Sequence, residues 1–158
     1  MDQRQSLLHA LALLAEAMAP ARHPWWIISS AALVLHGRDP GDVGDIDVLF
    51  DPRDAESLLG SLGLPVAPGR GTNLFRSTVF AAWNCAGVAV ELFAGFELCE
   101  EGVWTPILPA SRIPVEVEGR VLYVPDQAEL RAMFLRFGRP KDLARAAMLS
   151  PSGPSPSR

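Results

Sequence analysis

Gly44-Asp-Ile-Asp-Val-Leu-Phe50 is the stretch of this sequence that decides the fold. Side chains alternate between the two faces of a strand, so Asp45 and Asp47 should share one face while Ile46 points into the core. Two carboxylates this close repel each other unless a cation lies between them, and oxygen ligands suit Mg²⁺. An ordinary strand entered through an acidic turn would carry the same triplet. The triplet alone therefore leaves both interpretations open.

The composition is that of an ordinary globular protein. The chain has 158 residues, of which 49% are hydrophobic and 20% are charged, and its formal net charge is −4. This length predicts one domain, which we place at residues 1–149. The acidic balance argues against a protein that coats nucleic acid. Cys85 and Cys99 have neither metal-site nor disulfide spacing, which indicates free thiols in a reducing cytoplasm.

The two ends of the chain differ in character. Apolar residues recur at helical spacing from Leu7 to Met18, which predicts an amphipathic helix packed on the domain. A secretory leader is the alternative, but the start has no net positive charge and the apolar run is too short to span a membrane. We therefore expect no membrane contact. Residues 150–158 consist of Ser, Pro, Gly and Arg with nothing to bury, which predicts a disordered tail.

The remaining pattern mixes strands and helices. Asp126 and Glu129 have the spacing of a capping box that starts a helix. The predicted fold class is α/β (α+β), with a small mixed β-sheet flanked by helices. We expect strands at 25–28, 45–50, 74–83, 88–93, 113–117 and 121–124, and helices at 31–36, 53–62, 127–137 and 141–149, in addition to the first helix.

Two further features accompany the acidic triplet. Ser29 and Ser30 separate a predicted strand from a helix, where hydroxyl side chains cap the helix and exposed N–H groups can hold a phosphate. Taken alone, an ordinary N-cap is the simpler interpretation of this pair. Glu91 lies in the apolar strand 88–93, where an acid is costly unless it faces water or a cation.

The order of these features resembles that of the nucleotidyltransferase superfamily typified by DNA polymerase β, in particular its minimal single-domain members. The similar segments are Ile27-Ile-Ser-Ser-Ala-Ala-Leu33, Asp45-Ile-Asp47-Val and Val90-Glu91-Leu. Gly138-Arg-Pro-Lys-Asp-Leu143 also resembles the Arg/Lys-Lys-Asp-Leu segment between the last helices of many small bacterial members. The resemblance spans residues 22–149 and implies a nucleotidyltransferase-like fold.

The resemblance also implies roles for the acids and the serines. Asp45, Asp47 and Glu91 would bind Mg²⁺, with two ions in an active enzyme. Glu91 would ligate the catalytic metal, accept the proton of the acceptor hydroxyl, or both. Ser29 and Ser30 would hold the β- and γ-phosphates of an NTP.

Three basic residues could also belong to the site, and the sequence departs from the family pattern at three points. Arg70, Arg139 and Lys141 could meet the remaining phosphate charge, although each could equally be a solvated surface cation. Ser29 replaces the glycine that normally begins the phosphate turn, and its Cβ could weaken nucleotide binding. The third acid is Glu rather than Asp, and the segment between the serines and the triplet is slightly long.

These inferences predict a Mg²⁺-dependent enzyme that moves a nucleoside monophosphate from an NTP to a hydroxyl group. The acceptor would be a small molecule, such as an aminoglycoside-like antibiotic, or a protein, as in toxin–antitoxin systems that use this fold. Because no second domain is evident, a homodimer or partner protein could complete the site, and nucleic acid is a disfavoured substrate. The alternatives are an inactive nucleotide- or partner-binding module, which Ser29 favours, and a plain structural domain.

Overall fold

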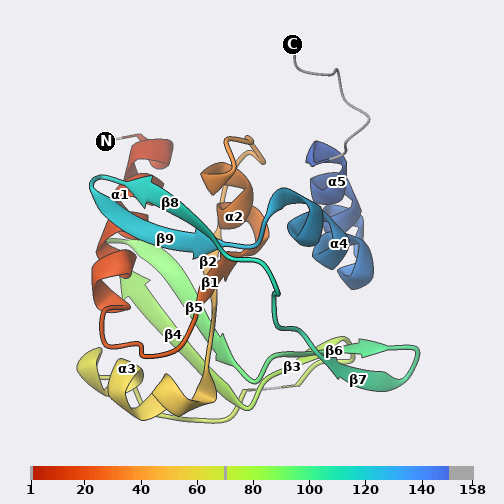
Figure 1. The fold of residues 1–158 in the computed structure, drawn as a ribbon, viewed down its shortest axis with the longest axis horizontal. Coiled ribbons are helices and arrows are strands. Elements are labelled where there is room, and N and C mark those ends of the chain that lie inside the picture. The colour runs from red at the N-terminus through yellow and green to blue at the C-terminus, as the bar shows by residue number, and fades with distance from the viewer. Residues whose placement is uncertain (1, 70, 150–158) are drawn as a thin grey trace.

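The computed structural model describes residues 2–69 and 71–149 (Figure 1). The predicted disordered tail and Arg70 therefore lie outside the described residues. The elements are α1 (Gln3–Ala17), β1 (Trp26–Ile28), α2 (Ser29–Leu35), β2 (Asp45–Phe50), η1 (Pro52–Asp54), α3 (Ala55–Ser61), β3 (Phe75–Arg76), β4 (Val79–Cys85), β5 (Val88–Ala94), β6 (Glu97–Glu100), β7 (Val103–Pro106), β8 (Ile113–Val117), β9 (Arg120–Val124), α4 (Gln127–Phe137) and α5 (Pro140–Met148).

The central sheet is mixed, as the sequence predicts. Its strands lie in the order β1-β2-β5-β4, with β2 parallel to β5 and the other two pairs antiparallel. The parallel pair needs a crossover, which the chain makes through α3 and two further strands. The register sets Asp47 beside Glu91 on one side and beside Ile28 on the other.

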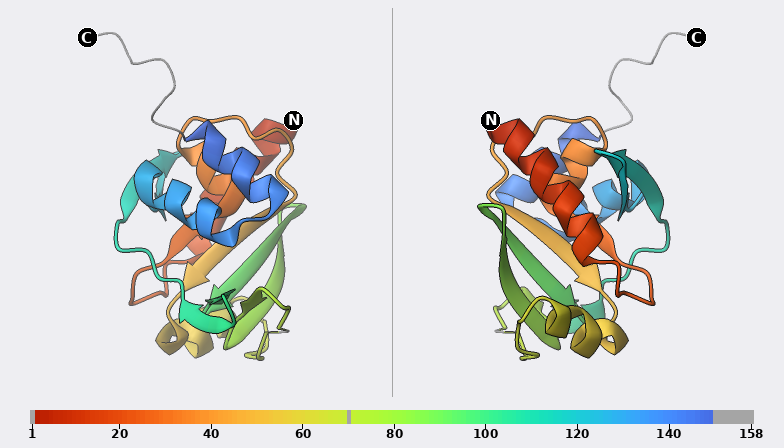
Figure 2. Two further views of the ribbon diagram at one scale, coloured as in Figure 1. Left: turned by 90° about the vertical axis from the view of Figure 1, so that its right-hand side faces the viewer. Right: turned by 90° about the vertical axis from the view of Figure 1, so that its left-hand side faces the viewer.

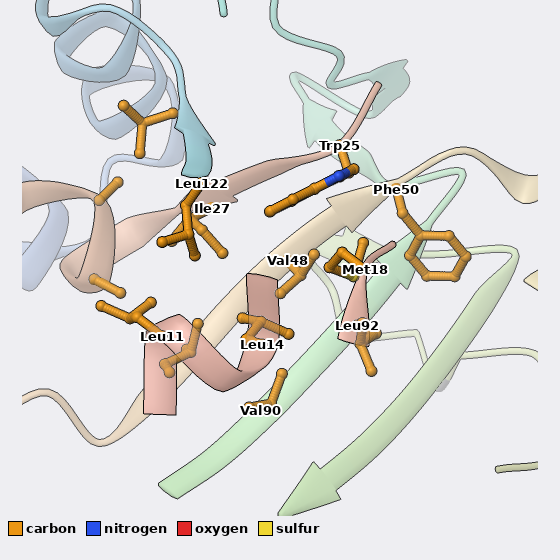
Figure 3. Packing of buried hydrophobic residues seen from close by; sticks show 14 of the residues in the cluster. Leu11, Leu14, Met18, Trp25, Ile27, Val48, Phe50, Val90, Leu92 and Leu122 are labelled. Carbon is orange, nitrogen blue, oxygen red and sulfur yellow. The ribbon is translucent and has the colours of Figure 1, made fainter. Parts of the chain in front are cut away.

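One face of the sheet buries the main hydrophobic core. Alternate residues of β2, such as Ile46 and Val48, are completely buried, as is Leu92 of β5. Figure 3 shows Leu11 and Leu14 of α1 packed against this face. Helix α1 begins where Asp2 accepts a hydrogen bond from the Gln5 backbone, so the predicted amphipathic helix is confirmed.

Helices α4 and α5 lie on the opposite side of the sheet from α1 (Figure 2). A second, smaller cluster of buried side chains forms here, and it includes Trp26, Leu49, Phe96, Met133 and Phe137. Because the two residue sets alternate along β1 and β2, the sheet is buried over part of both faces. This second face also carries Asp45 and Asp47.

A three-stranded sheet, β3-β6-β7, extends away from the central sheet (Figure 1). The sequence predicts one strand over 74–83. This prediction is wrong, because Ser77 and Thr78 interrupt the strand and divide it into β3 and β4. The residues before the break pair with β6, and those after it pair with β5. The hairpin of β6 and β7 is a further element that the sequence analysis missed.

The C-terminal elements match the predicted order. The β8–β9 hairpin turns at Glu118 and Gly119, both of which have positive φ angles of 51° and 80°. Asp126 caps α4 by accepting from the Glu129 backbone. The predicted capping box is half wrong, because the Glu129 carboxylate instead accepts from the backbone N–H groups of Ala110 and Ser111, each at 2.7 Å. Across the described residues, no helix is both long and apolar enough to cross a membrane.

Candidate functional site

The three acids that the sequence predicts as a group lie together on the second face of the central sheet. Asp45 and Asp47 come from β2, and Glu91 comes from the neighbouring strand β5. Each contributes a carboxylate oxygen, and these oxygens all lie within 4.8 Å of one another. The parallel register of β2 and β5 produces this cluster, because it sets Asp47 directly beside Glu91.

The electrostatics of the cluster are unfavourable without a cation. The pKa of Asp47 is raised to about 7, chiefly by burial and also by the charges of Glu91 and Asp45, against a lowering effect of the Ser29 side chain. Burial and Asp45 also raise the pKa of Glu91, while its hydrogen bond with Asp47 and the charge of Lys141 oppose them. Converging carboxylates that resist ionisation together are typical of functional sites.

The donor set fits a divalent cation. Within the described part of the chain, Asp47 Oδ1 is buried and has no hydrogen-bond partner. A bound Mg²⁺ would satisfy this oxygen and offset the repulsion among the three carboxylates, and Mg²⁺ prefers oxygen ligands. The residues that could hold such an ion are Asp45, Asp47 and Glu91, the set that the sequence predicts.

Ser29 lies at the junction between β1 and α2 in an unusual backbone conformation. Its φ angle is +61°, in the left-handed region that favours glycine and that other residues rarely occupy. The helix cap is Ile28, with no side-chain capping bond, so the prediction that the serine hydroxyls cap α2 is wrong. The resemblance to the family implied a glycine at Ser29, and the backbone has the conformation that a glycine would supply.

A cavity of about 760 Å³ connects the acids to the other predicted site residues. Its lining includes Ser29, Ser30, Arg139 and Lys141, all of which the sequence analysis singled out. Two further cations, Arg76 and Arg145, also line it and were missed. Neither carries a sequence signal beyond its charge. Arg76 reaches the cavity through the pairing of β3 with β6, which was not predicted, and Arg145 is the fourth-from-last residue of α5.

The cations around the cavity differ in how strongly they are already paired. The guanidinium of Arg139 donates to both carboxylate oxygens of Asp142, at 2.5 and 3.0 Å, and the Asp142 side chain is completely buried. Arg145 lies 4.0 Å from the same carboxylate. Lys141 is exposed in the first turn of α5, and its charge acts on Glu91. Lys141 is therefore better placed than Arg139 to meet an added negative charge.

Phenylalanine side chains form the apolar part of the cavity wall. Phe80 of β4 and Phe93 of β5 are partners in the register, and their ring centroids are 5.2 Å apart. Phe75 stacks on Phe96 at 5.3 Å and meets Phe137 edge to face at 5.1 Å. The sequence analysis did not identify this wall, although Phe93 follows Glu91 by two residues and must share its face of the strand.

Comparison of the sequence with protein-family models and with curated proteins finds no match. Solved structures do match. A proposed nucleotidyltransferase from Thermotoga maritima is 21% identical, with 94% of this chain and 92% of that chain covered and a TM-score of 0.73. The antibiotic-resistance factor ANT(2″)-Ia is 14% identical (94% and 84% covered, TM-score 0.54), and the lincosamide antibiotic adenylyltransferase LnuA is 13% identical (92% and 97%, TM-score 0.52). The chain has a nucleotidyltransferase-like fold.

Proposed function

We propose that this protein is a Mg²⁺-dependent nucleotidyltransferase that moves a nucleoside monophosphate from an NTP to a hydroxyl group. The observation that carries the proposal is the cluster of Asp45, Asp47 and Glu91 within 4.8 Å, in a cavity that also contains Ser29 and Lys141. The structural neighbours support it, because they include adenylyltransferases that modify antibiotics. The likeness to them is one of fold, so the activity is our inference.

The reaction needs positioning and charge neutralisation more than covalent help. The acceptor oxygen forms a bond to the α-phosphorus, the bond to the β-phosphate oxygen breaks, and pyrophosphate leaves. Divalent ions held by the three carboxylates would neutralise the phosphate charge. Glu91 borders the same cavity and could accept the hydroxyl proton. Ser29, Ser30 and Lys141 would bind the departing phosphates.

Mass spectrometry of reaction mixtures tests the proposal. The protein is incubated with Mg²⁺, each NTP and a panel of hydroxyl acceptors, and the products are searched for an added nucleoside monophosphate and for released pyrophosphate. Asp47→Ala should abolish both signals. Asp42→Ala is the matched control, because Asp42 is an exposed acid outside the cavity lining. Product that survives Asp47→Ala would overturn the assignment of the site.

A second candidate function is an inactive module that binds a nucleotide or a partner protein. One observation favours it, since Ser29 keeps a Cβ at a position whose φ of +61° suits glycine and where a phosphate would approach. Tight NTP binding without product across the acceptor panel would support this module over the enzyme.

The remaining expectations concern the setting of the protein. We propose that it acts in the cytoplasm, where NTP and Mg²⁺ are present, and the free thiols of Cys85 and Cys99 are compatible with that compartment. A homodimer or a partner protein could complete the acceptor side of so small a domain. Sedimentation analysis with and without NTP would test the homodimer.

A further inference from the structure

The two ends of the cavity, along the direction of the central strands, are lined by side chains of different chemistry. Ile28 pairs with Asp47, so the serine turn that follows Ile28 lies toward the Asp45 end of β2. Phe93 follows Glu91 toward the other end of β5, and its register partner is Phe80. The three carboxylates therefore lie between the Ser29–Ser30 turn and the phenylalanine side chains of the cavity lining, which we call the aromatic wall.

The aromatic wall is a preformed surface. The rings of Phe80 and Phe93 are only partly buried, and they are backed by Phe96, whose centroid lies 5.3 Å from that of Phe93. Phe75 is partly exposed in the same way and stacks on Phe96. Exposed rings held by packing behind them suit a flat apolar ligand, because little ordering is lost when it binds.

The geometry of in-line attack places the acceptor beside the aromatic wall. In nucleotidyl transfer, the attacking and the leaving oxygens lie roughly in line on opposite sides of the phosphorus. If Ser29 and Ser30 hold the leaving phosphates, the acceptor hydroxyl must approach from the far side of the acids. That side is the one lined by Phe80 and Phe93.

The charges around the wall oppose a polycationic acceptor. Within residues 2–69 and 71–149, the carboxylates that line the cavity are the three of the acidic cluster. Ion-paired arginines flank the aromatic wall. The Arg139 guanidinium lies 4.9 Å from the Phe75 ring and is paired with Asp142, and Arg76 on the adjacent strand residue is paired with Glu97 at 2.6 Å. Several ammonium groups on one ligand would find no free carboxylate here, because Glu97 and Asp142 are already paired with arginines and the three cluster carboxylates would hold the metal ions.

We infer that the acceptor is a hydroxyl compound with a flat, apolar body and without multiple ammonium groups. The inference rests on the proposed function and narrows its acceptor. An aryl glycoside has the required chemistry, whereas an aminoglycoside lacks it. The structural neighbour ANT(2″)-Ia forms a complex with adenylyl-2″-tobramycin, so the two proteins would differ in acceptor class on a shared fold.

The test compares 4-nitrophenyl β-D-glucoside with tobramycin. Binding is followed by saturation-transfer NMR in the presence of Mg²⁺ and a non-hydrolysable ATP analogue, and transfer is followed by mass spectrometry with ATP. The glucoside should bind through its aryl protons, and Phe80→Ala and Phe93→Ala should each weaken this binding about tenfold. Val103→Ala is the control, because Val103 is an exposed apolar residue of β7 outside the cavity lining.

Three outcomes overturn the inference. The first is that tobramycin binds as tightly as the glucoside, and the second is that the glucoside does not bind. The third is that the phenylalanine variants bind the glucoside as tightly as the wild type. A fourth is a loss of ATP-analogue binding in Phe93→Ala with glucoside binding intact, which would make the wall a nucleobase site. Failure of the proposed function looks different, since the glucoside would then bind through the phenylalanines with no transfer of nucleotide to any acceptor.

Discussion

Asp47→Asn should stabilise the metal-free protein while it abolishes activity. Asp47 is a partly accessible residue whose Oδ1 atom is buried and unpartnered among the described residues, beside the carboxylates of Asp45 and Glu91. Ionising it in the absence of a cation therefore costs free energy in the folded state and not in the unfolded state. Asparagine has nearly the same shape and carries no charge, so the substitution removes the repulsion and the ionisation together.

The magnitude follows from the pKa. Burial, together with the charges of Glu91 and Asp45, raises the pKa of Asp47 from 3.8 to about 7, which corresponds to about 4 kcal/mol of lost stability above pH 7. The folded state holds the Asp47 proton more tightly than the unfolded state, so the contribution of Asp47 to stability falls as pH rises from about 4 to about 7 and is constant outside that window. The asparagine amide still has polar atoms to satisfy, so we expect a gain of about 1–3 kcal/mol at pH 8.

Urea unfolding of both proteins in EDTA, at pH 4 and at pH 8, measures this difference. The variant should be the more stable protein at pH 8, and the two should converge near pH 4. Saturating Mg²⁺ should then raise the stability of the wild type and leave the variant unchanged. A difference that does not vary with pH, or a variant that is less stable at pH 8, would refute the reasoning. Asp42→Asn, in the exposed loop, is the matched control.

Three shorter predictions concern the rest of the site. Ser29→Val should lower the free energy of unfolding by about 2 kcal/mol because a β-branched residue fits poorly at φ +61°, whereas Ser29→Gly should fold at least as well, as thermal denaturation would show. Asp142→Asn should cost about 2–3 kcal/mol in urea unfolding, because the buried carboxylate binds Arg139 twice. Lys141→Ala should raise the KM for NTP about tenfold, and Arg22→Ala, at an exposed residue away from the cavity lining, should not.

The residue pattern was sufficient to predict two of the three acids of the cluster. Alternation along a strand sets Asp45 and Asp47 on one face, and this periodicity depends on backbone geometry alone. Their proximity to Glu91 depends on the pairing of β2 with β5, which the resemblance to a known family implied and local pattern could not. Strand pairing between residues far apart in the sequence cannot be predicted from the local residue pattern.

Other parts of the site could not be predicted because tertiary contacts override local preference. Serine at position 29 favours a helix cap, yet the packing of β1 against α2 holds it at a positive φ. Strand β6 begins at Glu97 and has an acid at two of its four residues, so its alternation is not that of an apolar strand. Arg76 enters the cavity because its strand pairs with β6, and no nearby residue signals this.

The proposed function depends most directly on whether the acidic cluster holds a divalent cation. Titration with Mn²⁺ alone, followed by electron paramagnetic resonance of the free ion, measures this without any acceptor or turnover. We predict saturable binding to the wild-type protein that is lost in Asp47→Asn and retained in Asp42→Asn. Equal Mn²⁺ binding by the wild type and Asp47→Asn, or none by the wild type, would contradict the assignment of Asp45, Asp47 and Glu91 as a metal site.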